Sequence, residues 1–97
     1  MYVCVRLPRA LREVAGGAST VTISIDAADD AVTVEAILDE LAVTHPALER
    51  RVRDEEGRPR VHVNVFVGAD NVRDLDGLVT RVTAGQDLSI LPAISGG

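Results

Sequence analysis

Residues 61–67 read Val-His-Val-Asn-Val-Phe-Val, the most regular alternation of valine with other residues in the chain. Successive side chains of a β-strand point to opposite faces of a sheet, so this pattern predicts a strand that buries its valines on one face. Gly68-Ala69-Asp70 is expected to turn the chain, and residues 71–73 to pair back as a short edge strand. A sheet therefore forms the centre of the predicted fold.

One segment has the apolar spacing of an amphipathic helix, with Val34, Ile37, Leu38 and Leu41 on one stripe. Thr33 is a suitable N-cap for this helix. The helix is expected to end at His45-Pro46, because the residue before a proline is disfavoured in the α region. Residues 48–52 indicate a ragged turn or short helix, and residues 54–60 a polar loop.

Three further strands are predicted from alternation, over residues 2–7, 21–25 and 88–91, the last of them broken by Pro92. Residues 8–20 are expected to be a long connection, too long for a tight hairpin turn. One good helix and four or five strands favour a two-layer α+β fold, in which a mixed sheet carries the helix across one face. We expect a single domain over residues 1–97.

The composition is that of an ordinary globular protein with an acidic balance: 46% hydrophobic, 26% charged and a net charge of −5. This charge and the two aromatic residues argue against a nucleic-acid partner. The single cysteine, Cys4, cannot supply a disulfide framework, an iron–sulfur cluster or a structural zinc site. No apolar run approaches the ~20 residues of a membrane span, and the first residues lack the pattern of a signal peptide, so we expect a cytoplasmic protein without a membrane partner.

The order and spacing of the predicted elements resemble the β-grasp fold of ubiquitin-like proteins. The motifs that sharpen the resemblance are Val63-Asn64-Val65-Phe66-Val67, Asn71-Val72-Arg73, Gly85-Gln86-Asp87 and the final Leu-Ser-Ile-Leu-Pro-Ala-Ile-Ser-Gly-Gly of residues 88–97. They resemble the sulfur-carrier family that includes the small subunit of molybdopterin synthase, the thiazole-synthesis carrier and the carrier of an alternative cysteine pathway. The molybdopterin subunit usually has two consecutive prolines where this chain has Pro92-Ala93, which favours the cysteine-pathway type or a relative serving the synthesis of another thio-metabolite.

The resemblance implies a function for the diglycine Gly96-Gly97. A partner adenylyltransferase of the ubiquitin-activating type uses ATP to adenylate the Gly97 carboxylate, and sulfur then replaces AMP to give a thiocarboxylate. Ile94, Ser95 and Gly96 would belong to a flexible tail, residues 93–97, that enters the partner's active site. The chain is then a protein cosubstrate and not an enzyme, with no catalytic residue, no bound cofactor and no metal of its own.

The sulfur acceptor stays open at this point. The resemblance implies a biosynthetic enzyme, such as a pyridoxal-dependent enzyme like cysteine synthase or the large subunit of molybdopterin synthase. A thiazole precursor and a sugar are also open as sulfur acceptors. Two alternative functions also stay open: a permanent small subunit of molybdopterin synthase, and a ubiquitin-like modifier joined through Gly97 to lysines of target proteins.

A partner-binding surface is predicted on the sheet face opposite the helix. If the helix covers the valine row, Phe66 and His62 share the other face with Ser89 and Leu91, and Cys4 lies beside them. An exposed apolar patch there would mark the interface, with Phe66, Leu91 and His62 as its candidate residues. The alternative is that Phe66 and Leu91 fill a second small core under a loop.

Overall fold

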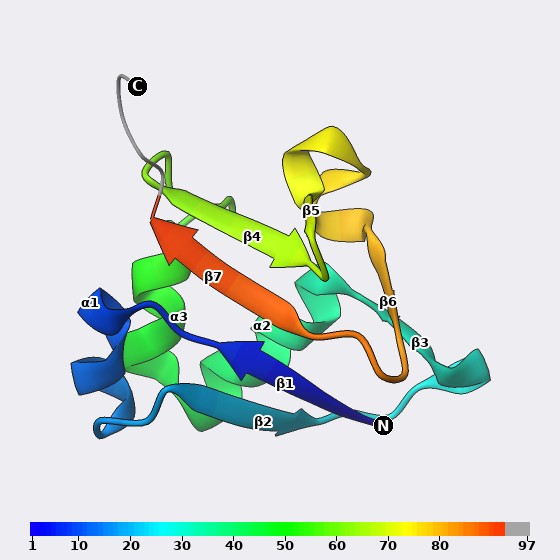
Figure 1. Cartoon of the computed structure of the whole chain (residues 1–97), viewed down its shortest axis with the longest axis horizontal. Helices are drawn as coiled ribbons and strands as arrows, with labels where there is room; N and C mark the ends of the chain where they lie inside the picture. Colours follow the sequence, from blue (N-terminus) through cyan, green and yellow to red (C-terminus); the bar gives the residue numbers. More distant parts are fainter. Residues whose placement is uncertain (93–97) are drawn as a thin grey trace.

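A mixed five-stranded sheet is the main element of the computed structural model, which describes residues 1–92 (Figure 1). In sheet order its strands are β2 (Thr20–Ser24), β1 (Tyr2–Arg6), β7 (Leu88–Pro92), β4 (Val63–Val67) and β5 (Asp70–Asn71). β1 and β7 run parallel, while the other neighbours run antiparallel. The last strand of the chain is thus held inside the sheet, between β1 and β4.

Two helices pack behind this sheet in the view of Figure 1: α2 (Val34–Thr44) and α3 (Pro46–Val52). Thr33 caps α2 as predicted, because its Oγ1 accepts a hydrogen bond from the Ala36 N–H at 3.1 Å. The backbone leaves helical geometry at His45, and Pro46 then begins α3. Leu48 and Val52 are fully buried, so of the two alternatives expected here, a ragged turn or a short helix, the structure has the helix.

One hydrophobic core joins the two layers. Alternate residues of the sheet face the helices and are buried: Val3, Val5, Val21, Ile23, Val63, Val65, Val67, Leu88 and Ile90. The predicted helical stripe of Val34, Ile37, Leu38 and Leu41 is buried against them, each at 0% exposure. The predicted α+β class, with a mixed sheet and a main helix on one face, is confirmed.

Several predicted boundaries were wrong. The long connection over residues 8–20 is present, but the short helix α1 (Arg9–Arg12) and the 3₁₀ turn at Glu13–Ala15 within it were not predicted. β4 begins at Val63 and not at Val61, which is 84% exposed; the Val63 N–H instead donates to the Arg60 carbonyl at 3.0 Å and closes a turn before the strand. Pro92 does not break the last strand but ends it, opposite Val63.

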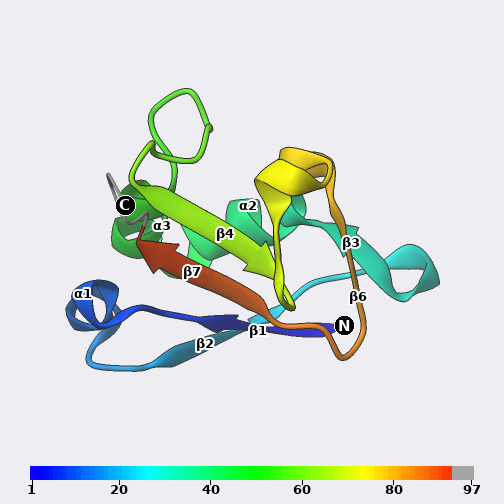
Figure 2. The ribbon, with the colours of Figure 1, turned by 45° about the horizontal axis from the view of Figure 1, so that its top comes forward.

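The expected edge strand at 71–73 is shorter than predicted. β5 ends at Asn71, and a 3₁₀ turn follows over Val72–Asp74, because Asn71 Oδ1 accepts a hydrogen bond from the Arg73 N–H. A second sheet was not predicted: β3 (Ala31–Thr33) pairs antiparallel with β6 (Arg81–Thr83). Figure 2 shows this pair beside the end of the main sheet, where Val32 and Val82 join the core.

Within residues 1–92, no helix is long and apolar enough to cross a membrane.

Candidate functional site

The sheet surface turned away from α2 and α3 is called the open face here. Its side chains alternate with the core residues, so Cys4 of β1, Phe66 of β4 and Ser89 and Leu91 of β7 all belong to it. In Figure 1 the open face is turned toward the viewer, and none of the described segments crosses it. The sequence placed these four residues on this face correctly.

Phe66 and Leu91 are neighbours on the open face. Phe66 lies directly opposite Ser89, and Leu91 lies opposite Asn64, so the two apolar residues are diagonal partners across β4 and β7. Leu91 is 44% exposed, Phe66 is half-buried, and neither belongs to the buried core. This exposure argues against a second core under a loop and favours an accessible apolar patch.

His62 lies elsewhere than predicted. The strand starts at Val63, so His62 is an exposed residue of the preceding turn and not a member of the strand face. It lines a hollow of about 200 Å³ at the end of β7, together with Leu11, Leu91 and Pro92. The structure therefore brings His62 and Leu91 together, whereas Phe66 does not line this hollow.

Sequence reasoning missed this hollow. One wall is made by Ala10 and Leu11 of α1, a helix that was not predicted within the long connection. A signal was present in the apolar residue Leu11, which packs against the core. The described chain ends at Pro92, on the rim of this hollow. The tail residues Ile94, Ser95, Gly96 and Gly97 lie outside the described residues.

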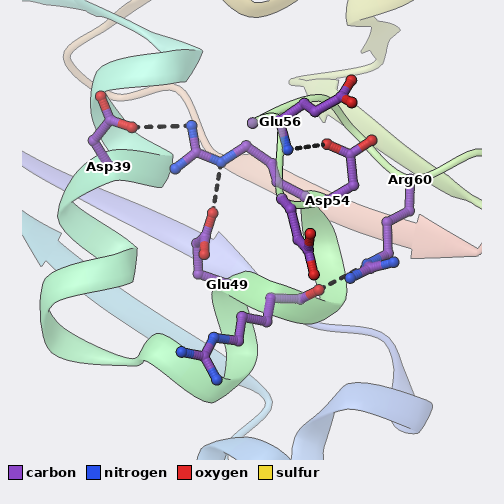
Figure 3. Close-up of a pocket in the computed structure, with 9 residues that line it drawn as sticks. Asp39, Glu49, Asp54, Glu56 and Arg60 are labelled. Atoms are coloured by element: carbon purple, nitrogen blue, oxygen red, sulfur yellow. Dashed lines mark hydrogen bonds and ion pairs between the residues drawn. The ribbon is translucent and has the colours of Figure 1, made fainter.

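A second hollow, of about 760 Å³, lies between α2, α3 and the loop after α3 (Figure 3). At its base the Arg53 side chain is 7% exposed and forms ion pairs through Nε with Glu49 Oε1 at 2.7 Å and through Nη1 with Asp39 Oδ1 at 2.9 Å. On the loop side, the Arg60 Nε donates to the Arg50 carbonyl at 2.7 Å. These contacts join the two helices and the loop.

Asp54 organises that loop. Its Oδ1 accepts hydrogen bonds from the Glu56 N–H at 2.9 Å and the Arg58 N–H at 3.0 Å. The backbone bond from Arg58 is the main reason that the pKa of Asp54 lies below its ordinary value of 3.8. Across residues 1–92, no buried side-chain nitrogen or oxygen lacks a partner, and no group of three or more His, Cys, Asp or Glu residues is arranged to hold a metal ion. Asp54 thus serves the structure of the loop, while Asp39 and Glu49 pair with Arg53.

The mixed sheet with parallel first and last strands, crossed by one main helix, defines a β-grasp domain of the ubiquitin-like class. The ThiS family model matches residues 5–97. The chain is 32% identical over 99 residues to the sulfur carrier protein CysO of Mycobacterium tuberculosis, covering 100% of both chains. It is also 38% identical over 87 residues to the small archaeal modifier protein 1 of Haloferax volcanii, covering 90% of this chain and 91% of the relative. The chain belongs to the ThiS family of ubiquitin-like sulfur carriers.

Solved structures agree with this assignment. CysO in the BexX/CysO complex of Amycolatopsis orientalis superposes with a TM-score of 0.80 at 34% identity, over 98% of this chain and 99% of the other. The small archaeal modifier protein of H. volcanii superposes with a TM-score of 0.78 at 34% identity, over 100% of both chains. A molybdopterin converting factor subunit of Pyrococcus furiosus, at 18% identity and a TM-score of 0.68, shares the fold. The predicted fold and family are both confirmed.

Proposed function

We propose that this chain carries sulfur as a thiocarboxylate on Gly97 and delivers it to a biosynthetic enzyme in the cytoplasm. The observation that carries the proposal is that the family match extends through the final Gly96-Gly97, a few residues beyond a strand held between two neighbours in the sheet. The folded body would serve as a handle for partner proteins, and the last residues as the reagent. The chain itself would be a cosubstrate that holds neither a cofactor nor a metal.

The carboxylate needs activation before it can accept sulfur. An α-carboxyl group has a pKa of ~3.5, so at neutral pH it is an anion that resists nucleophilic attack. In the partner enzyme, a carboxylate oxygen attacks the α-phosphorus of ATP and pyrophosphate leaves. Sulfide then attacks the acyl carbon, and AMP leaves with the bonding electron pair to give the thiocarboxylate. If a persulfide attacks instead, the product is an acyl disulfide, and a second thiol must exchange with it, leaving as a disulfide, to release the thiocarboxylate. ATP is thus a substrate of the partner, an adenylyltransferase of the ubiquitin-activating type.

The length and composition of the tail suit this reaction. Residues 93–97, if extended, span at most ~17 Å, enough to reach an active site while the body stays outside. Glycine lacks a Cβ, so Gly96 and Gly97 allow the backbone to pass through a narrow channel that larger residues would block. Ile94 and Ser95 would lie between the channel and the body.

The sulfur acceptor is proposed to be a pyridoxal-dependent enzyme like cysteine synthase. Two observations favour it: the full-length similarity to CysO carriers, and Pro92-Ala93 in place of two consecutive prolines. A second candidate function is conjugation through Gly97 to lysines, which the similarity to a small archaeal modifier protein favours. A permanent role in molybdopterin synthase has weaker support, because that likeness is at 18% identity and concerns the fold alone.

The test is intact-protein mass spectrometry. The chain is incubated with ATP, a sulfide source and an activating enzyme of the ubiquitin-activating type, after its starting mass has been matched to a polypeptide ending at Gly97. Exchange of one oxygen for sulfur is expected, and fragmentation should place it on Gly97. A variant lacking Gly97 is the control and should remain unchanged. No exchange with any of several such enzymes contradicts the proposal, while lysine-linked conjugates without thiocarboxylate favour the modifier function.

A further inference from the structure

Strand β2 leaves one edge of the sheet open. It is the outermost strand beside β1, and in both Figures 1 and 2 no segment of the described chain lies along its outer side. Its pairing with β1 is regular from Tyr2 opposite Ser24 to Arg6 opposite Thr20. An outer strand of this kind presents backbone donors and acceptors to a further strand.

The hydrogen bonds at the two ends of this pair establish which backbone groups face outward. The Ile25 N–H donates to the Met1 carbonyl and the Met1 amino group donates to the Ile25 carbonyl, at 2.9 and 3.0 Å. At the other end the Leu7 N–H donates to the Ser19 carbonyl at 2.9 Å. Bonded pairs alternate in an antiparallel ladder, so the odd-numbered residues of β2 face β1. Thr20, Thr22 and Ser24 therefore direct their N–H and C=O groups outward.

This edge lacks the features by which proteins block strand pairing. Edges are usually protected by charged residues, proline, bulges or very short strands. β2 reads Thr-Val-Thr-Ile-Ser, and it lies in residues 14–25, the longest run of the sequence without a charged residue. The opposite edge differs, because β5 has only two residues and ends in a 3₁₀ turn. β2 thus offers a regular, uncharged edge of five residues at which a further strand can pair.

We propose that a second copy of this chain pairs with β2, antiparallel, about a two-fold axis at Thr22. In this register Thr22 faces Thr22 of the other copy and Thr20 faces Ser24, so the three outward residues satisfy one another's backbone groups. The nearest charge, Asp26, falls opposite Ala18, so no like charges meet across the strands. A copy with a net charge of −5 can approach here because the edge itself is uncharged.

The pairing is compatible with sulfur transfer. β1 separates β2 from β7, so Phe66 and Leu91 on β4 and β7 are not part of the shared edge. The dimer would join two sheets into one continuous sheet of twice the width, with both copies able to engage a partner. A result that excludes the dimer would therefore leave the proposed sulfur transfer unaffected.

The first test is sedimentation velocity over a wide range of protein concentration, where a reversible monomer–dimer equilibrium is expected. Thr22→Pro removes an N–H that points to solvent in the monomer, a position at which an edge strand tolerates proline. The variant should keep the far-ultraviolet circular dichroism and melting temperature of the original chain, with dimer affinity lowered about tenfold or more. A chain that stays monomeric at all concentrations, or a dimer that Thr22→Pro leaves unchanged, overturns the proposal.

The register is tested with two matched double variants, which also serve if Thr22→Pro does not fold. Thr20→Lys with Ser24→Glu places opposite charges across the axis twice and should tighten the dimer, by about tenfold. Thr20→Lys with Ser24→Lys places like charges at the same positions and should weaken it by a similar factor. Within one chain the two positions are four residues apart on a strand, too far for a direct pair. Equal dimer affinities of the two variants overturn the proposed register.

Discussion

The Arg53 guanidinium donates through Nε to Oε1 of Glu49, four residues earlier, at 2.7 Å, and both side chains are largely buried, at 7% and 15% exposure. The same guanidinium reaches Asp39 on α2, so one side chain connects α2 to the end of α3. Arg53 also forms a β-bridge with Pro59, which ties the loop after α3 to the same point. Arg53 thus joins α2, α3 and the loop after α3.

Replacing Arg53 should destabilise the fold markedly. Arg53→Ala leaves the Glu49 carboxylate without its partner in a largely buried position, so we expect the free energy of unfolding to fall by about 2–4 kcal/mol. Asp39 is 62% exposed, and Asp39→Ala should cost less than about 1 kcal/mol. Urea denaturation of both variants measures the difference. Equal losses would contradict the assignment of Glu49 as the dominant partner.

The N-cap of α2 allows a second stability test. Thr33→Ala removes the acceptor of the Ala36 N–H and should lower the free energy of unfolding by about 1 kcal/mol. Thr33→Ser keeps a hydroxyl at the same place and should recover most of that loss. Thermal or urea unfolding of the two variants separates the contribution of the capping hydrogen bond from that of the methyl group. A serine variant as unstable as the alanine variant would contradict the role of the hydroxyl.

The loop after α3 should respond to acid through Asp54. Its pKa is lower in the folded chain than its ordinary value of 3.8, so its stabilising effect is present above that value and is lost as the pH falls below it toward the folded pKa. The difference in stability between the original chain and Asp54→Ala should therefore shrink over that acidic range. Titration of the Asp54 carboxyl by NMR measures the shift directly.

Glu55→Ala is the matched control for that titration. Glu55 lies in the same loop and, among the described residues, accepts none of the side-chain hydrogen bonds that hold it. Its replacement should leave the Asp54 titration nearly unchanged. A carboxyl of Asp54 that titrates at or above 3.8 in the original chain would contradict the hydrogen-bonded geometry of the loop.

The apolar patch on the open face is predicted to dock the activating enzyme. Phe66→Asp should fold, because Phe66 lies outside the buried core, and should lower kcat/KM for adenylation at least about tenfold. Val79→Asp, at a position 63% exposed in a 3₁₀ turn away from the open face, is the control and should have little effect. If Phe66→Asp unfolds the chain, as followed by circular dichroism, the docking hypothesis fails.

The hollow at the end of β7 is tested separately. His62 and Leu91 line it together, so His62→Ala should weaken adenylation or sulfur transfer if a partner enters the hollow. The exposed position of His62 predicts no change in melting temperature. Transfer rates equal to those of the original chain would remove His62 from the interface and leave Phe66 and Leu91 as its candidates.

The alternation of the strands and the stripe of the main helix could be predicted because each reflects one buried face. Val63, Val65 and Val67 are buried as their period of two requires, and Thr33 caps the helix as its chemistry suggests. The β3–β6 pair could not be predicted in the same way, since three-residue strands hold too few positions to show a period. Their pairing depends on contacts between segments about fifty residues apart.

The candidate site was predictable in part for a similar reason. The positions of Phe66 and Leu91 on one face follow from strand alternation alone. The hollow that adds His62 depends on α1, a helix of only four residues. A segment so short has no helical periodicity to read, and it forms because its neighbours in the fold support it. Local sequence patterns therefore indicate which residues share a face of the sheet, but not that α1 forms one side of the hollow.

The parallel pairing of β1 with β7 has a practical consequence for studying this carrier. Arg6 pairs with Ser89. Met1 lies five residues before Arg6, and Pro92 lies three residues after Ser89. The two ends are therefore roughly 26 Å apart along the strands. Figure 1 shows the N-terminus and the end of β7 at opposite ends of the sheet. A dye or an immobilising tether acylated onto Met1 keeps an amide N–H for the bond to Ile25. Surface-based kinetics can then anchor the carrier at one end while an enzyme approaches the other.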